Sequence, residues 1–192
     1  MKFLAIDTTA EKLTVVLNVE GKMTFSDIET GKTGHSKILL PTISTLLDSQ
    51  KVDVKELDAI AVVVGPGSFT GIRIGVSAVT AICFATGAKR ISVTSFEMLA
   101  YSREKVAVSV DAGHGNLYVA KCENGKVLST DFIAAEDAVK LDRSAYVVEP
   151  IVSSAVALNA VVERKINEGE YVSVFEPFYM RKSQAERTKD EN

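Results

Sequence analysis

Hydrophobic and polar positions along the chain form a pattern that predicts strands and helices in a definite order. In the first half, two strand-like runs are joined by a tight-turn signal at Glu20-Gly21, and the continuous apolar run 59–64 is typical of a strand buried on both faces. Apolar residues at helical spacing predict two helices, one of which follows the glycine-rich turn 65–67. The expected elements are strands at 2–8, 13–19 and 22–29, a helix at 35–50, a strand at 59–64, a helix ending near 86 and a strand at 90–94.

The second half repeats this order. Strands are expected at 106–110, 117–122 and 127–133, a short helix at 136–141, a strand at 145–148 and an amphipathic helix at 153–168. In both halves the first strand ends in an aspartate followed by small residues, Asp7 and Asp111. Such a repeat indicates two duplicated lobes, at 1–104 and 105–180, followed by a charged tail at 181–192 that we expect to be frayed.

The predicted fold class is α/β, with two lobes that each contain a mixed sheet and helices: a three-strand meander and then helix, strand and helix. This order resembles the actin, hexokinase and Hsp70 ATPase superfamily, in which two aspartate-bearing hairpins face each other and hold phosphate and metal. A resemblance in fold sets an expectation and does not establish an activity.

Composition and charge narrow the function classes. Of the 192 residues 46% are hydrophobic and 24% charged, which excludes a disordered chain. With 22 basic and 25 acidic residues the net charge is −3, which disfavours strong autonomous binding of nucleic acid. The two cysteines lack zinc-site spacing, and the longest uncharged stretch, Ile74 to Ala88, is too short and too polar to span a bilayer. We therefore expect a cytoplasmic protein without membrane association.

The glycine-rich segment Gly65–Gly75 follows a strand and opens a helix, a place where backbone amides can hold an anion. Its spacing matches neither a dinucleotide fingerprint nor a P-loop. Gly71, Gly75 and Ala78 share one helical face, so this face permits close packing, either inside the lobe or against another subunit.

The candidate catalytic residues are sparse. Asp7 and Asp111 are candidate phosphate- or Mg²⁺-facing acids, but Asp7-Thr8-Thr9 lacks the glycine that lets such a hairpin close on phosphate, so we interpret both as vestigial phosphate hairpins. The only two histidines lie in different halves, which disfavours a histidine metal site. No site residue is therefore assigned as catalytic or metal-binding.

Four segments resemble the TsaB (YeaZ) family of bacterial tRNA threonylcarbamoyladenosine biosynthesis proteins. They are Phe3–Thr9, Gly65–Gly75, Val110-Asp111-Ala112 with Leu117-Tyr118, and Pro177–Arg181. The family often carries an arginine and an acidic residue where this chain has Gly113 and Asn116, which puts in doubt any role of this loop that needs charge.

The resemblance implies a non-catalytic partner of TsaD, the enzyme that transfers threonylcarbamoyl to N6 of adenosine 37 in tRNAs that read ANN codons. TsaD carries a His-x-x-x-His metal pair, whereas the matching segment Ser95–Leu99 has no histidine. The partners implied are TsaD, the ATPase TsaE in a larger complex, a second copy when TsaD is absent, and tRNA only within the complex. Nucleotide and metal are expected on TsaD and TsaE, with no cofactor in this chain. The expected interface comprises His35, Leu39, Ile43, Leu46, Thr70, Gly71, Ile74, Gly75, Ala78 and Ile82.

Two alternatives remain open at this point. One is an enzyme of the same fold, either an ATPase or kinase that uses Asp7 and Asp111, or a glycoprotease-like peptidase. The other is a protein that binds tRNA by itself through basic residues of the tail. These residues are Arg181, Lys182, Arg187 and Lys189.

Overall fold

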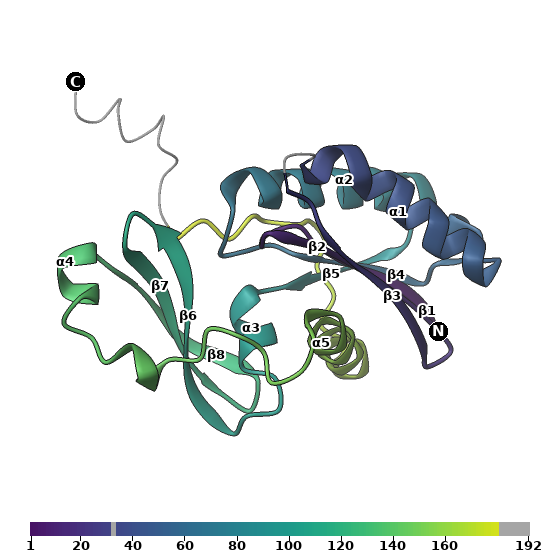
Figure 1. Cartoon of the computed structure of the whole chain (residues 1–192). Coiled ribbons are helices and arrows are strands. Elements are labelled where there is room, and N and C mark those ends of the chain that lie inside the picture. Colours follow the sequence, from purple (N-terminus) through teal and green to yellow (C-terminus); the bar gives the residue numbers. More distant parts are fainter. Residues whose placement is uncertain (32–33, 181–192) are drawn as a thin grey trace.

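The computed structural model describes residues 1–31 and 34–180, which form two β-sheets with helices around them (Figure 1). The larger sheet, here the first-lobe sheet, has the strand order β3-β2-β1-β4-β5. Its strands are β1 (Lys2–Asp7), β2 (Lys12–Val19), β3 (Lys22–Glu29), β4 (Ala59–Val63) and β5 (Lys89–Val93). Strands β1, β2 and β3 pair antiparallel, whereas β4 pairs parallel with both β1 and β5, so the sheet is mixed as predicted.

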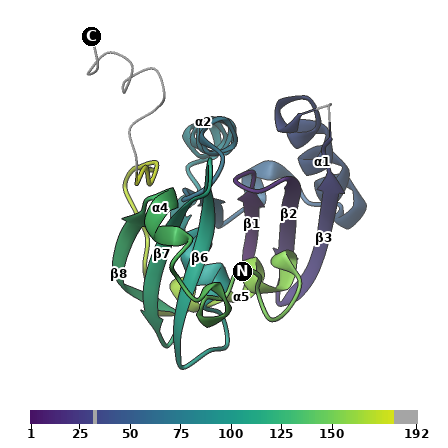
Figure 2. The same ribbon diagram turned by 60° about the vertical axis from the view of Figure 1, so that its left-hand side comes forward.

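Helices cover both faces of the first-lobe sheet. Side chains alternate along β1, so that Leu4 and Ile6 join the core beneath α1 (His35–Gln50) and α2 (Phe69–Thr86). Phe3 and Ala5 join the opposite core, beneath α5 (Ser154–Glu168). Figures 1 and 2 show α1 and α2 side by side on one side of the strands and α5 on the other. The central strands are therefore buried on both faces, which explains the unbroken apolar run of β4.

The second-lobe sheet is smaller and wholly antiparallel, with strand order β6-β7-β8. Its strands are β6 (Lys105–Gly113), β7 (Asn116–Glu123) and β8 (Lys126–Ile133). The short helix α3 (Ser95–Leu99) joins the two sheets, and α4 (Ala135–Ala138) packs against β7. The helices η1 (Val54–Glu56) and η2 (Arg143–Ala145) are single 3₁₀ turns.

The second half departs from the predicted repeat in three places, the first being that its sheet is wholly antiparallel and not mixed as predicted. The strand expected at 145–148 is reduced to one parallel bridge between Val147 and Val108, because η2 occupies the start of that segment. The helix expected at 153–168 forms as α5, but its buried residues Ala155, Leu158 and Val162 pack on the first-lobe sheet. Helical periodicity shows that one face is buried and does not show which sheet covers it.

The chain after α5 also returns to the first-lobe sheet. Val172 bridges Arg90 of β5, and the backbone N–H of Phe178 donates to Val64 O at 2.8 Å. The Phe178 side chain packs against the first-lobe core and also against the core between α3 and the second-lobe sheet. This segment, residues 171–180, therefore ties the two lobes together, whereas residues 181–192 lie outside the described residues.

Helix α2 is long and apolar enough to cross a membrane when only length and composition are considered. Its mean hydropathy over 18 residues is 1.5, and 33% of that window is buried. The uncharged stretch judged from sequence begins at Ile74, whereas the helix begins at Phe69 and includes Arg73. One such helix is weak evidence for a membrane span, because core helices pass the same test, and α2 packs on β4.

Candidate functional site

Asp7 ends β1, and its side chain closes the turn that leads into β2. Its Oδ1 accepts hydrogen bonds from the backbone N–H and from the hydroxyl of Thr9, both at 2.7 Å. Burial raises the pKa of the Asp7 carboxyl above its ordinary value, and the two hydrogen bonds from Thr9 offset only part of that effect. The hairpin amide that would be offered to a phosphate oxygen is therefore engaged by the hairpin's own aspartate.

Asp111 plays the same local part in the second lobe. The backbone N–H of Gly113 donates to Asp111 Oδ1 at 2.8 Å, although this aspartate is exposed. Asn116 then fixes the loop, since its Nδ2 donates to Gly113 O and its Oδ1 accepts from Ala135 N, each at 2.8 Å. The uncharged residues of this loop thus bind it to the start of α4.

Both aspartates line one cavity between the lobes, with a volume of about 640 Å³. Thr9, Pro66 and Ser95 belong to its first-lobe wall, and Ser95 Oγ donates to Pro66 O at 2.7 Å. The structure therefore brings together the two hairpins that the sequence pattern paired.

Gly71 and Gly75 of α2 pack inside the first lobe. A Cβ atom at Gly71 would lie 1.9 Å from the carbonyl oxygen of Thr8, and one at Gly75 would lie 2.4 Å from Thr8 Oγ1. The same hydroxyl donates to Gly71 O at 2.7 Å. Of the two alternatives for this glycine face, packing within the lobe is the one observed for these two glycines. This corrects their assignment to a partner interface, because neither is accessible in the folded lobe.

The expected interface on α1 needs a similar correction. Leu39, Ile43 and Leu46 are buried in the core beneath α1 and are not available to a partner. The periodic apolar stripe of an amphipathic helix faces its own sheet, so residues chosen by that spacing are core residues. The signal that was missed is an apolar residue on the opposite, polar face: Leu40 on α1 is 57% exposed and Phe84 on α2 is 87% exposed.

Four α2 positions of the expected interface keep surface exposure. Thr70 is exposed, whereas Ile74, Ala78 and Ile82 are half-buried at the edge of the core. His35, at the start of α1, lines a second cavity of about 800 Å³ together with Thr9, Gly67 and Asp111. Its Nε2 is buried and has no hydrogen-bond partner within residues 1–31 and 34–180.

Metal ligation finds no support in the part of the chain that the structure describes. No group of three or more histidine, cysteine, aspartate or glutamate side chains there is placed to hold a metal ion.

The segment Ser95–Leu99 forms α3, with a capping box between Thr94 and Glu97 at its start. Residues 95–97 thus begin a capped helix.

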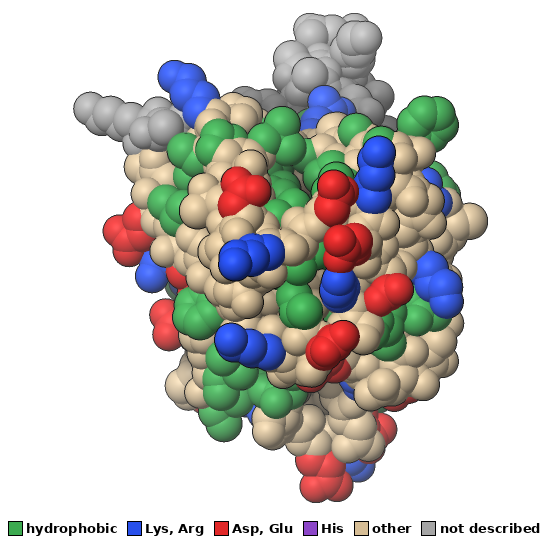
Figure 3. Space-filling view, turned by 90° about the vertical axis from the view of Figure 1, so that its right-hand side faces the viewer, with side chains coloured by type: hydrophobic (Ala, Val, Ile, Leu, Met, Phe, Trp, Pro, Cys, Tyr) green, Lys and Arg blue, Asp and Glu red, His purple; other side chains and the backbone are tan. Residues whose placement is uncertain are grey.

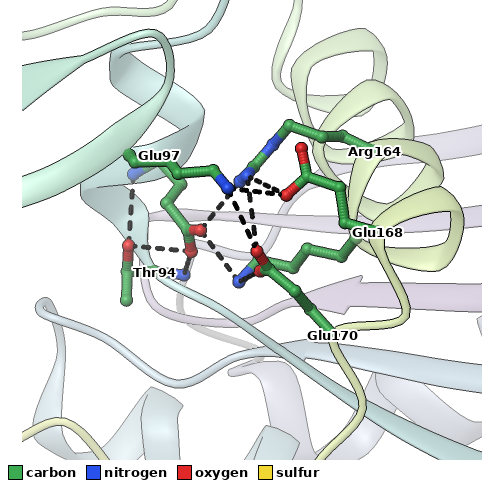
Figure 4. A network of polar contacts seen from close by, with 7 residues as sticks. Thr94, Glu97, Arg164, Glu168 and Glu170 are labelled. Atoms are coloured by element: carbon green, nitrogen blue, oxygen red, sulfur yellow. Dashed lines mark hydrogen bonds and ion pairs between the residues drawn. The ribbon is translucent and has the colours of Figure 1, made fainter.

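A polar network joins α3, α5 and the second-lobe sheet (Figure 4). Arg164 and Lys165 of α5 approach Glu97 Oε1 of α3 at 3.0 and 2.8 Å. Lys126, the first residue of β8, reaches Glu168 Oε2 of α5 at 2.8 Å. Because α5 lies on the first-lobe sheet, these contacts hold the two lobes in one relative position.

A cluster of rings holds the segment around Tyr179 at the start of α2. Tyr179 stacks on Phe69 with ring centroids 4.6 Å apart, and the Arg73 guanidinium lies 4.1 Å above the Phe69 ring. Arg73 Nε also donates to the Tyr179 hydroxyl at 3.3 Å. The next residue of the family-like motif, Arg181, lies outside the described residues.

Charges of both signs are interspersed on the face of the molecule shown in Figure 3, with hydrophobic side chains between them. That face has no stripe of a single sign that would follow a nucleic-acid backbone. The basic tail residues considered as an alternative, Lys182, Arg187 and Lys189 among them, lie outside the described residues.

Solved structures and curated proteins resemble this chain over most of its length. A Pseudomonas aeruginosa protein described as similar to peptidase YeaZ is 27% identical, with a TM-score of 0.76, over 94% of this chain and 99% of that one. A structure of YeaZ from Pseudomonas aeruginosa is 25% identical, with the same TM-score, over 93% and 99%. TsaB from Haemophilus influenzae is 29% identical over 67% of this chain and 57% of the relative, and TsaB from Bacillus subtilis is 31% identical over 62% and 53%. The chain thus matches a little over half the length of these curated relatives.

One acidic hairpin on the mixed first-lobe sheet and one on the second-lobe sheet face the same interlobe cavity, an arrangement typical of the actin-like ATPase fold. A family model described as TsaD, tRNA N6-adenosine threonylcarbamoyltransferase, matches residues 27–150, which is more than half of the chain. Together with the relatives above, this match shows that the chain belongs to the TsaB (YeaZ) family, within the wider group that includes TsaD.

Proposed function

We propose that the chain acts in tRNA threonylcarbamoyladenosine biosynthesis as a non-catalytic subunit that binds TsaD. In this proposal TsaD carries the metal and the transferase site, and TsaE joins a larger complex and supplies ATPase activity. The tRNA contacts the chain only within that complex. The names of its relatives place those proteins in this pathway, and the family relationship supports the same pathway for this chain.

The observation that carries the proposal is the apolar outer surface of α1 and α2. Phe84 is almost fully exposed on α2, and Leu40 is exposed on the neighbouring helix α1. Ala81 and Ala85 lie beside Phe84 and are exposed as well, so the surface combines one large apolar side chain with small ones. Large exposed side chains of this kind are typical anchors of protein interfaces. We name this surface, formed by Leu40, Ile74, Ala81, Phe84 and Ala85, the α1–α2 face.

The hairpin geometry favours a subunit without its own phosphate chemistry. The amides of Thr9 and Gly113 are both bound by aspartates of their own turns, at 2.7 and 2.8 Å. A nucleotide would have to displace these bonds before it could use either amide. When TsaD is absent, a two-fold arrangement would let two copies cover their α1–α2 faces with the same patch, which accounts for the expected homodimer.

The direct test is the affinity of the chain for purified TsaD, measured by biolayer interferometry with wild type and three variants. Phe84→Ser and Leu40→Ser remove exposed apolar side chains of the α1–α2 face, and each is expected to weaken binding by about tenfold or more. Leu128→Ser is the matched control, since Leu128 is 65% exposed on β8 of the other lobe. Equal affinities for all four proteins would reject the α1–α2 face as the TsaD interface.

The alternative of a nucleotide-dependent enzyme is tested separately by calorimetric titration with Mg-ATP. The proposal expects no heat of binding from the isolated chain. Micromolar binding that Asp7→Ala abolishes would favour the ATPase or kinase alternative instead.

A further inference from the structure

The interlobe cavity has the size, the lining and the unpaired charge of a ligand site, although the proposed function leaves it without a role. We propose that it binds a small organic cation, an amine with an apolar body, and that Asp7 is its main contact. This inference is independent of TsaD binding, which concerns residues of α1 and α2 that do not line the cavity.

The volume and the apolar lining suit a small molecule. At about 640 Å³ the cavity falls within the range of about 300–1,000 Å³ that is usual for small-molecule sites. Both lobes contribute apolar side chains: Met98 and Leu99 from α3, Val110 and Leu117 from the second-lobe sheet, and Val148 from the following loop. A ligand's apolar body would therefore be enclosed from several sides.

Asp7 is the most deeply buried of the carboxyl groups that line the cavity. Its side chain lines the cavity, and the residue is only 6% exposed. Oδ1 is saturated by Thr9, whereas Oδ2 has no hydrogen-bond or ion-pair partner among the described residues. Oδ2 can therefore accept a hydrogen bond from a group that enters the cavity, and a largely desolvated carboxylate is stabilised by a donor or a positive charge that reaches it. An ammonium group in the cavity would supply both.

The remaining charges of the lining favour the same ligand class. Asp111 and Glu149 add two more carboxyl groups, and Arg143 is the one basic side chain among the described lining residues. A polyphosphate would meet an acidic cavity whose hairpin amides are already engaged, so a nucleotide is disfavoured. A cation with hydrogen-bond donors is favoured, because Thr9, Ser95 and Ser109 also present hydroxyl groups to the cavity.

The walls of the cavity are held in place by contacts outside it. Glu97, next to the wall residue Met98, is fixed by Arg164 and Lys165, and Lys126 ties the second-lobe sheet to α5 (Figure 4). The site is thus formed before any ligand enters, which limits the entropy that binding would lose.

The test uses three probes that share one aromatic body and differ in charge: tyramine (ammonium), tyrosol (hydroxyl) and 4-hydroxyphenylacetate (carboxylate). Affinities are measured on the full chain by protein-observed NMR titration at pH 7.5, with shift changes mapped to the cavity. We expect tyramine to bind at least tenfold more tightly than tyrosol, and 4-hydroxyphenylacetate to show no saturable binding.

Variants then assign the contact. Asp7→Asn keeps the shape and the acceptor for Thr9 but removes the charge, and it should weaken tyramine binding about tenfold. Asp111→Asn should weaken it about threefold, because Asp111 is exposed. Glu136→Gln, an exposed change outside the cavity, is the matched control and should leave the affinity unchanged.

Equal binding of tyramine, tyrosol and 4-hydroxyphenylacetate would overturn the proposal, as would shift changes that map elsewhere or an Asp7→Asn affinity equal to that of wild type. The absence of tyramine binding would overturn it as well. If Asp7→Asn does not fold, the contrast among the three probes on wild type and the Asp111→Asn titration decide the question. A loss of TsaD binding in the Phe84→Ser variant would not change any of these results.

Discussion

The packing of α2 on the turn after β1 can be tested by adding a single methyl group. In Gly75→Ala the new Cβ would lie 2.4 Å from Thr8 Oγ1 and 3.2 Å from Val62 Cγ2, so the nearest obstacle is one side-chain hydroxyl. Overpacking of this kind costs about 1–3 kcal/mol, and we expect about 2 kcal/mol for this change. Thr8→Ala removes the obstacle at a cost of about 1 kcal/mol, because it loses the hydrogen bond to Gly71 O.

A double variant tests whether the Thr8 hydroxyl is the group that a methyl at position 75 would overlap. If the hydroxyl is the obstacle, Gly75→Ala combined with Thr8→Ala should lose about 1.5 kcal/mol rather than the additive value of about 3 kcal/mol. Gly71→Ala is the matched comparison, since its Cβ would lie 1.9 Å from the Thr8 carbonyl oxygen, which Thr8→Ala leaves in place. This variant should lose about 3 kcal/mol or more in either background.

Urea unfolding followed by circular dichroism measures all of these free energies, provided that the m-values agree. A neutral Gly75→Ala, or equal rescue of both glycine variants by Thr8→Ala, would refute the packing of α2 on Thr8. The glycine face would then be free for a partner.

Three further predictions concern charge and burial. Asp7→Asn should raise the melting temperature at pH 7, and this gain over wild type should shrink on acidification. The reason is that a carboxyl whose pKa is raised on folding favours the folded state at low pH and loses that contribution as the pH rises. An equal gain in melting temperature at pH 4 and pH 7 would contradict this. Glu97→Ala should lower the free energy of unfolding in urea by about 3 kcal/mol, because Arg164 and Lys165 lose their buried partner. The control Lys12→Ala removes an exposed ion pair, 3.5 Å from Glu29, and should lower it by less than about 1 kcal/mol. Similar losses in the two variants would be inconsistent with the burial of Glu97. Burial raises the pKa of the Cys122 thiol to about 11. Ellman's reagent at pH 8 should therefore react with Cys122 only after the chain is unfolded. Rapid labelling of Cys122 in the native chain would contradict its burial.

The sequence predicts most of the first lobe because its local signals and its packing agree. The hairpin turn at Glu20-Gly21, the apolar strand β4 and the capped start of α3 are each decided by neighbouring residues. The destination of α5 could not be predicted, since an amphipathic helix fits any apolar sheet face and only the three-dimensional arrangement selects one.

The candidate site shows the same division. The two aspartate hairpins could be paired from element order alone, and the structure brings Asp7 and Asp111 to one cavity. Spacing failed for the interface, because the periodic residues Leu39 and Gly75 are the ones that face the core. Whether Phe84 is exposed depends on how α2 is rotated over β4, and in that arrangement Gly71 and Gly75 face Thr8 without room for a Cβ atom.

The central claim, a subunit required for transfer but not catalytic, is tested most directly by reconstitution. Threonylcarbamoyl transfer to tRNA would be measured by nucleoside chromatography with this chain alone, with TsaD and TsaE alone, and with all three. The account predicts modified adenosine only in the complete mixture, and a loss of product when Phe84→Ser replaces wild type. Product from this chain and threonylcarbamoyl-AMP without TsaD would contradict it and would show that the chain contains a catalytic site of its own.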